Sequence, residues 1–242
     1  MNNLITLIKK ELKDYFISPI AYVVIATFLI ATSIWFVFVK GLFISNQAEM
    51  RETFIFITQI LILVIPALTM RSWAEEKKSQ TLEIISTFPI SNFELIIAKF
   101  LSCLIFVTFT LVLTFPIPIT LNILGNPDNG IIIASYIGLI LLAASYIAIG
   151  QFVSMNTKNQ IVSFISSVAI IAILFIFGEP QFLQLMPSSF RVIFESLGLG
   201  SHYLSIAKGV LDTRDILYYL SLIIIVFYFI YKSSERIKKE GI

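Results

Sequence analysis

Long, continuous apolar runs separated by short polar segments make up most of the chain after its first 18 residues. A bilayer core of about 30 Å requires about 20 apolar residues in a helix that rises about 1.5 Å per residue. Six runs meet or approach this length: Pro19–Val39, Thr53–Met70, Phe93–Thr120, Ile131–Val153, Ile161–Phe177 and Ile216–Tyr231. Because the runs are apolar on both faces, unlike the alternating strands of a membrane β-barrel, they predict an all-α integral membrane protein with six transmembrane helices. One domain is expected over residues 1–242.

Residues 1–18 have a different pattern, in which apolar positions recur at the spacing of one helix face. These positions are Leu4, Ile5, Ile8, Leu12 and Phe16. Lys9, Lys10, Lys13 and Asp14 lie on the other side, so we expect a basic amphipathic interfacial helix in the headgroup plane. It should end near Ser18, because Pro19 disfavours helical geometry in the residue before it. The segment can also be interpreted as a basic signal that only sets topology, and the two interpretations are compatible.

A charged block, Arg71–Glu83, separates the second and third predicted spans. Ser72 followed three residues later by Glu75 is a capping-box pattern, which predicts a helix that begins at Ser72. Pro89 should end this helix. The pattern therefore favours a rigid elbow over residues 71–89, although an ordinary solvated loop with helical character fits the same residues.

The third span has a start signal of its own. Ser91 and Glu94 have capping-box spacing, and Ile90 and Leu95 are spaced for a hydrophobic staple. We therefore expect the third span to begin at Ser91, directly after the elbow.

Charge and composition agree with a membrane protein. The chain is 57% hydrophobic and 13% charged, with a mean hydropathy of +0.92, whereas soluble domains have about 25% charged residues. On one side of the membrane fall the basic residues Lys9, Lys10, Lys13, Arg71, Lys77, Lys78, Lys158, Lys232, Arg236, Lys238 and Lys239. The other side has Lys40, Arg51, Arg191, Lys208 and Arg214. This asymmetry predicts that both termini are cytoplasmic. Acidic residues alternate with the basic ones, so no nucleic-acid surface is predicted.

Residues 178–215, before the sixth span, are too many for a turn and too apolar for a soluble loop. Two short apolar runs separated by Pro187 predict short re-entrant or interfacial helices on the outer side. Polar residues here and in the second span are candidates for a substrate pathway or exit gate: Gln59, Glu179, Arg191, Glu195 and His202. The alternative is that the charged members are interfacial residues that extend to water.

Enzymatic chemistry is disfavoured by the residues available. His202 is the only histidine, and its neighbour Ser201 is poorly placed to be activated by it. One histidine and one cysteine, Cys103, cannot supply a zinc ligand set. Asp212 and Asp215 could hold Mg²⁺ for a lipid-phosphate transferase, but capping of the last span is the better account. We therefore do not expect an enzyme.

The elbow resembles the cytoplasmic elbow of ABC-2 type transporter permeases. The resemblance is carried by Glu75–Glu76, Thr81–Leu82–Glu83, Pro89 and a second helix over Asn92–Leu101. The lead-in Lys10–Phe16 with Ser18–Pro19 is also similar to that family, and Gly209–Tyr219 is similar to its gliding-motility-type members.

The resemblance implies a coupling helix between the second and third spans that docks on a separate ABC ATPase subunit. The residues implied to transmit its movement are Glu75, Glu76, Thr81, Glu83 and Pro89. No phosphate-binding loop G-x-x-x-x-G-K-[ST] occurs, so ATP and Mg²⁺ are expected on the partner, with no cofactor in this chain.

Further expectations follow from the resemblance. The chain should lie in the bacterial cytoplasmic (inner) membrane, in contact with membrane lipid, and pair with a second permease copy or a homologous permease. Its expected function is outward movement of a substrate that the sequence does not identify. The alternative is a non-transporting membrane scaffold, assembly factor or motility-machine component that uses the same ATPase. A channel is disfavoured because no charged or glycine-rich filter pattern is present.

Overall fold

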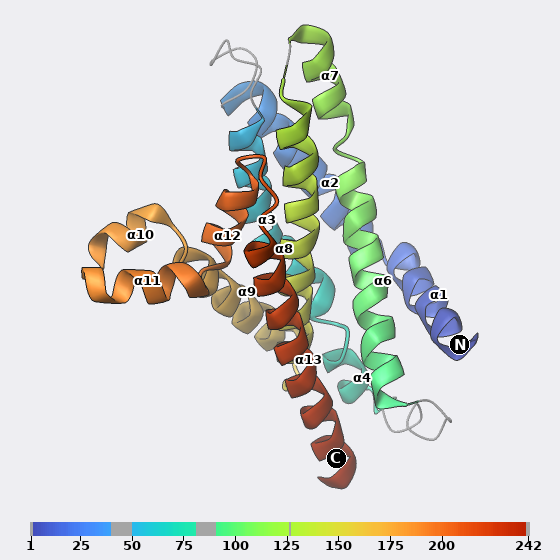
Figure 1. Cartoon of the computed structure of the whole chain (residues 1–242). Helices are drawn as coiled ribbons and strands as arrows, with labels where there is room; N and C mark the ends of the chain where they lie inside the picture. The colour runs from blue at the N-terminus through green and yellow to red at the C-terminus, as the bar shows by residue number, and fades with distance from the viewer. Residues whose placement is uncertain (1, 40–49, 81–90, 126, 241–242) are drawn as a thin grey trace.

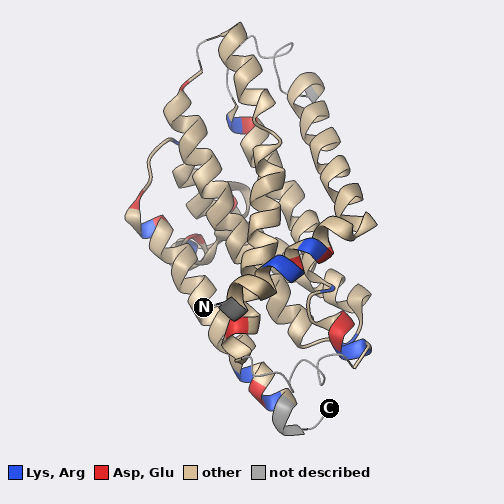
Figure 2. Ribbon diagram, turned by 90° about the vertical axis from the view of Figure 1, so that its right-hand side faces the viewer, with Lys and Arg blue, Asp and Glu red and all other residues tan. Residues whose placement is uncertain are grey.

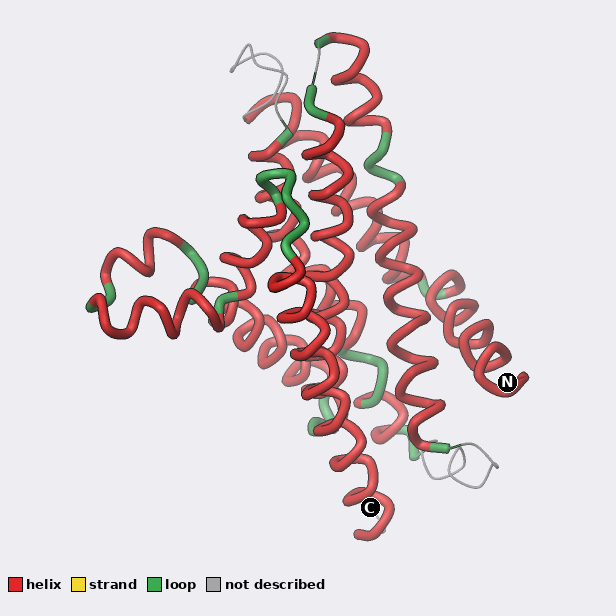
Figure 3. Tube along the Cα trace, viewed as in Figure 1, coloured by secondary structure: helices red, strands yellow, loops and turns green. Residues whose placement is uncertain are grey.

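The computed structural model describes residues 2–39, 50–80, 91–125 and 127–240. Within these ranges every regular element is a helix, and the described connections are short (Figure 3). Five helical segments in the described part are long and apolar enough to cross a membrane: Pro19–Phe38, Arg51–Lys78, Asn92–Leu124, Asn129–Met155 and Thr213–Ile237. The prediction of an all-α, multi-pass membrane protein is therefore confirmed.

The predicted amphipathic helix is α1 (Asn2–Ile17), and it ends where expected. The amide of Ser18 donates to the Asp14 carbonyl at 3.1 Å, and α2 (Pro19–Ile34) then begins with its proline in the first turn. A proline is tolerated there because the first helical N–H groups have no intrahelical partner. The ring of Tyr15 stacks on Phe106 of the third span at 5.3 Å, so the apolar face of α1 is docked on the bundle.

The first and third predicted spans are not uniform α-helices. A π-helical turn, η1 (Trp35–Val39), continues α2, and α3 (Arg51–Thr69) returns beside it. The third predicted span forms two helices, α6 (Asn92–Val112) and α7 (Pro116–Leu124). The break precedes Pro116, whose ring removes a backbone donor and clashes with the preceding turn.

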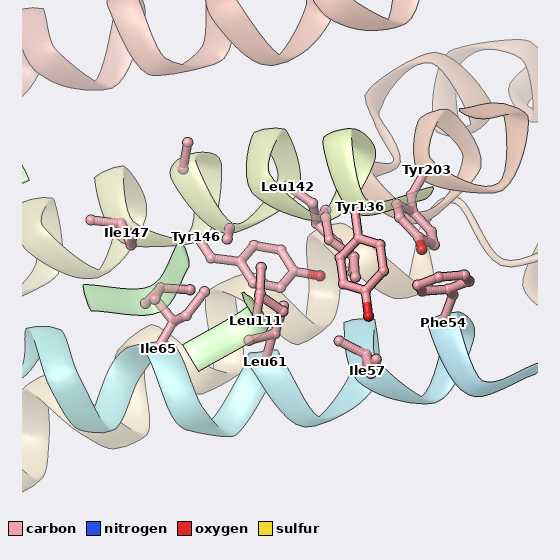
Figure 4. Close-up of a cluster of buried hydrophobic side chains, with 14 of the residues drawn as sticks. Phe54, Ile57, Leu61, Ile65, Leu111, Tyr136, Leu142, Tyr146, Ile147 and Tyr203 are labelled. Carbon is pink, nitrogen blue, oxygen red and sulfur yellow. The ribbon is translucent and has the colours of Figure 1, made fainter. Parts of the chain in front are cut away.

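Helix α8 (Asn129–Met155) lies at the centre of the bundle and packs on α3, α6, α9 and α13. Figure 4 shows Tyr136 and Tyr146 of α8 extending toward Ile57 and Leu61 of α3. Small residues permit this close packing. Gly150 lies so near the Thr69 hydroxyl of α3 that a Cβ at this position would collide with it. Small side chains at helix interfaces are typical of membrane bundles, where backbones approach closely.

The fifth predicted span corresponds to α9 (Gln160–Ile176), which has only 17 residues. At about 1.5 Å per residue it is about 25 Å long, less than the hydrocarbon core of about 30 Å. In the described part of the chain, helix length therefore supports five spans, and the six-span arrangement stays a prediction.

Three short helices follow, as the sequence predicts: α10 (Pro180–Leu185), α11 (Ser188–Leu197) and α12 (Leu199–Ile206). Helices α10 and α11 project sideways from the bundle, and α12 returns to pack on α8, α9 and α13 (Figure 1). The last helix is α13 (Thr213–Glu240). Whether α10 and α11 re-enter the membrane stays a prediction.

Charged residues are more numerous toward the end of the bundle where both termini lie (Figure 2). Helix α4 (Ala74–Lys78) lies at this end as well (Figure 1). The capping box at the start of α6 is confirmed, because Ser91 Oγ accepts from the Glu94 amide at 3.1 Å and Glu94 Oε2 accepts from the Ser91 amide at 3.0 Å. Ile90, the other half of the predicted staple, lies outside the described residues.

Candidate functional site

The candidate site is the charged end of the bundle, where the elbow meets α1, α6 and α8. The elbow helix α4 begins later than its sequence predicts. Trp73 is its N-cap residue, and no side chain within α4 or its cap supplies a capping hydrogen bond. The amide of Ser72 instead donates to the Thr69 carbonyl at 3.0 Å in a turn that follows α3. The prediction that Ser72 and Glu75 form a capping box is therefore wrong.

A side chain from another helix caps α4 instead. Ser154 Oγ of α8 accepts hydrogen bonds from the amides of Trp73 and Ala74, both at 3.1 Å, and donates to the Met70 carbonyl at 3.2 Å. The first amides of a helix lack intrahelical partners, so one hydroxyl here satisfies donors that would otherwise be orphaned. Because Ser154 is far from the elbow in the sequence, no local pattern could have indicated this cap.

Apolar and polar contacts attach the elbow to three helices. Trp73 is 1% exposed and packs in a small cluster with Ile96 of α6, Met155 of α8 and Ile230 of α13. Lys77 Nζ donates to the Met155 carbonyl. The described part of the elbow, residues 71–80, is thus docked against the ends of the long helices.

A buried ion-pair cluster lies beside Trp73. Lys99 of α6 is 2% exposed, and its Nζ lies 2.6 Å from Glu76 Oε1 of α4 and 3.3 Å from Glu11 Oε2 of α1. The same ammonium lies 5.1 Å from the centroid of the Trp73 ring, within range of a cation–π contact. We call Lys99, Glu11 and Glu76 the Lys99 junction. It joins the interfacial helix, the elbow and the third span through a single ammonium group.

The electrostatics of the junction favour a fixed geometry. A buried charge is costly unless it is paired and hydrogen-bonded, and Lys99 meets both conditions through two carboxylates. Burial also raises the pKa of the neighbouring Tyr15 phenol, with a smaller contribution from Cys103. Besides the elbow pattern, which identifies Glu76, the sequence has a signal for Lys99: it is a lysine inside a predicted span, where a charge requires a partner.

A cavity of about 310 Å³ opens next to the junction, and we call it the elbow cavity. Its walls come from α1, the start of α2, the end of α3, the turn before α4, α4 itself and Lys99 of α6. Four carboxylates and two cations line it: Glu11, Asp14, Glu75 and Glu76 with Arg71 and Lys99. The elbow cavity therefore has more acidic than basic side chains.

The coupling residues implied by the resemblance have different environments. Glu76 belongs to the Lys99 junction, whereas Glu75 is exposed and lies 4.0 Å from Arg71 Nε. An exposed pair at this distance contributes little stability, so the Glu75 carboxylate is accessible to a partner. Thr81, Glu83 and Pro89 lie outside the described residues.

Among the described residues, no hydrogen bond or ion pair joins the side chains of the candidate pathway residues to one another. Gln59 faces outward from the middle of α3 and is exposed in the single chain. Arg191 Nε donates to the Leu183 carbonyl at 3.0 Å within the α10–α11 hairpin, and Glu195 is exposed on α11. Glu179 lies at the start of α10, where partial burial raises the pKa of its carboxyl.

His202 lies against Asp215, the residue that the sequence predicts as a cap of the last span. Its Nδ1 lies 2.7 Å from Asp215 Oδ1, and its Nε2 lies 3.2 Å from the Ser196 carbonyl. The ring stacks on Tyr218 with centroids 3.8 Å apart. Asp212 does bond to a first-turn amide, that of Arg214, at 2.9 Å, but Asp215 pairs with His202 instead. This pair joins α12 to α13.

Among the described residues, no group of three or more His, Cys, Asp or Glu side chains is arranged to hold a metal ion. The sequence matches no protein-family model and no curated protein.

Proposed function

We propose that this chain is the membrane-spanning permease subunit of an ATP-driven exporter of the ABC-2 type, working in a bacterial cytoplasmic membrane with a separate ABC ATPase subunit. The observation that carries the proposal is the Lys99 junction, in which an elbow carboxylate lies 2.6 Å from a buried ammonium in a long helix. A buried ion pair of this kind can transmit a movement of the elbow to the helices of the bundle.

The transmission step can be stated in terms of these contacts. An ATPase that displaces the elbow would move Glu76, and the paired Lys99 would carry the displacement into α6. Ser154 would carry it into α8, the helix at the centre of the bundle. Separating a buried pair leaves an uncompensated charge and costs about 3–5 kcal/mol, so the helices follow the elbow instead of parting from it. Glu75, which is exposed, is the described acidic residue best placed to meet the ATPase.

We further propose that two permease copies assemble through α3. Gln59 is an exposed amide in the middle of a span, and a polar side chain at that depth is better satisfied by another helix than by lipid. A second copy, or a homologous permease with a polar residue at the matching position, would supply the partner. The pathway for substrate would then lie between the two copies.

Topology supports placing the elbow in the cytoplasm. The end with α1, α4 and the C-terminal turns of α13 has most of the basic residues, and cytoplasmic segments are enriched in lysine and arginine (Figure 2). ATP is available on that side of the membrane. An ATPase bound to the elbow would therefore be on the side of the membrane where ATP is present.

The decisive experiment is to purify the chain from native membranes and identify an ABC ATPase that co-elutes. Glu75→Lys should reduce the amount of co-eluting ATPase, whereas Glu235→Lys, at the same end but on α13, should not. ATP-dependent flux in vesicles that contain both subunits would support export. ATP hydrolysis without flux would favour the scaffold or motility-machine alternative. ATP hydrolysis by the purified chain alone, or full ATPase retention by Glu75→Lys, would contradict the proposal.

A further inference from the structure

The elbow cavity has charged groups that the Lys99 junction does not use. The Lys99 ammonium is occupied by Glu11 and Glu76, while two other lining carboxylates, those of Asp14 and Glu75, have no close cation. Asp14 makes no ion pair among the described residues, and Glu75 has only the 4.0 Å approach of Arg71. The acidic excess means that the cavity favours a cation over an anion.

The cavity also has an apolar wall. Its apolar lining residues are Ile20 and Ala21 of α2 and Ala67 and Leu68 of α3. Only 22% of the first span is buried inside the chain, so the surface that leads away from this wall faces lipid. A volume of about 310 Å³ is at the small end of the range for ligand sites, about 300–1,000 Å³, and suits a headgroup instead of a whole lipid.

Position defines the kind of molecule that can reach this site. One wall is the amphipathic helix α1, whose exposed apolar residues include Ile17 at 64%. Such helices lie at the boundary between headgroups and acyl chains. Because α1 and the charged elbow both line the cavity, it lies where phospholipid headgroups are expected.

We propose that the elbow cavity binds a primary ammonium group joined to a phosphate, as in the headgroup of phosphatidylethanolamine. The ammonium would donate to the Asp14 and Glu75 carboxylates, and the phosphate would accept from Arg71, whose Nε is buried with no hydrogen-bond partner among the described residues. The acyl chains would follow α2 into the bilayer. This proposal requires that the chain crosses a membrane, and it does not require an ATPase partner.

The chemistry predicts a rank order of lipids. A primary ammonium has three donors for the two carboxylates, whereas the quaternary ammonium of phosphatidylcholine has none. Phosphatidylglycerol has a phosphate but no cation, and the acidic lining disfavours it. Retention should therefore fall from phosphatidylethanolamine through its N-methyl and N,N-dimethyl forms to phosphatidylcholine, with phosphatidylglycerol the weakest.

The test uses the full chain in mild detergent with equal amounts of these lipids, and mass spectrometry of the intact complex counts the lipids retained. Asp14→Asn and Glu75→Gln should each reduce retained phosphatidylethanolamine by about tenfold, the loss expected for one charge-assisted hydrogen bond. Glu235→Gln removes the same charge at the same end, outside the cavity, and should leave retention unchanged. Circular dichroism checks that each variant is folded, and the N-methyl series on the unmodified chain needs no variant.

Free phosphoethanolamine distinguishes the sources of this headgroup. Displacement of the lipid by phosphoethanolamine, but not by phosphocholine, supports the headgroup chemistry. It also shows that the cavity accepts the free headgroup. Lack of displacement while the lipid rank order holds supports a membrane lipid, since the acyl chains then contribute to binding. Equal retention of all the lipids, or an ethanolamine preference that persists in both cavity variants, would overturn the proposal.

Discussion

The hydroxyl of Ser154 lies 3.1 Å from the backbone amide of Trp73, and this hydrogen bond joins the central helix to the first residues of the elbow. The same oxygen also accepts from Ala74 at 3.1 Å, so a helix cap is supplied by a different part of the chain. An elbow capped in this way begins where α8 ends. Its position therefore depends on the position of α8.

Ser154→Ala should release the start of the elbow. Removing a capping hydroxyl by substitution with alanine costs about 0.5–2 kcal/mol. We expect faster proteolysis at the elbow and a lower unfolding temperature in detergent. Ser145→Ala is the matched control, because Ser145 is on the same helix and donates only to the Leu141 carbonyl of its own helix, at 3.2 Å. Equal effects of the two substitutions would refute a specific role for Ser154.

Lys99→Met should leave two partly buried carboxylates without their shared cation. Removing one partner from a buried pair costs about 3–5 kcal/mol, and thermal unfolding should show a loss of that order. Adding Glu11→Gln and Glu76→Gln to Lys99→Met should recover much of the stability, since no charge then stays unpaired. If the triple variant is as unstable as Lys99→Met, packing instead of charge explains the loss.

Gly150→Ala should separate α3 from α8. The added Cβ meets the Thr69 hydroxyl, and overpacking of this kind costs about 1–3 kcal/mol. Thr69→Gly in the same chain removes the obstructing side chain and should restore close packing. Unfolding temperatures of the two single variants and the double variant give the coupling between the positions, and additive losses would show that the two residues are not in contact.

His202→Leu should weaken the attachment of α12 to α13. Asp215 is 6% exposed, and removing the imidazole leaves a buried carboxylate oxygen without its hydrogen-bond partner, which costs about 1–3 kcal/mol. Cysteines placed at exposed positions of α12 should then react faster with a water-soluble thiol reagent. The double variant His202→Leu with Asp215→Leu should react more slowly than the single variant, because no buried charge is left.

Gln59→Leu should weaken self-association if α3 forms the proposed interface between two copies of the chain. Interhelical polar contacts in membranes contribute about 0.6–2 kcal/mol, so the dimer fraction at a fixed protein-to-detergent ratio should fall severalfold. Leu63→Gln would place a new amide one turn away, on the same exposed face, as a control for general effects of polarity. Unchanged dimerisation in Gln59→Leu would remove α3 from the interface.

Local patterns predicted the elements that depend on neighbouring residues. The end of α1 at Ser18–Pro19 and the capping box of Ser91 and Glu94 each depend on residues only a few positions apart, and both are confirmed. The Ser72–Glu75 box has the same pattern but does not form, because the Ser72 and Glu75 amides donate to the Thr69 and Arg71 carbonyls, and Ser154 of a distant helix accepts from the two amides that begin α4. A tertiary contact here replaced a local signal.

The components of the candidate site were visible in the sequence, but their juxtaposition was not. Glu76 was identified through the elbow pattern, whereas Lys99 and Glu11 are separated from it by long stretches of chain. Likewise, Asp215 has the position of a helix cap, and its pairing with His202 depends on how α12 folds back onto α13. Such pairs follow from the packing of helices, which short motifs do not encode.

The Lys99 junction also has a consequence for how the protein is made. Glu11 and Glu76 precede Lys99 in the chain, so the ribosome has already produced both carboxylates when the lysine emerges. Both carboxylates are therefore available to the lysine as α6 enters the bilayer, before α8 is made and caps the elbow. Biogenesis of the first half of the bundle can proceed in the order of translation.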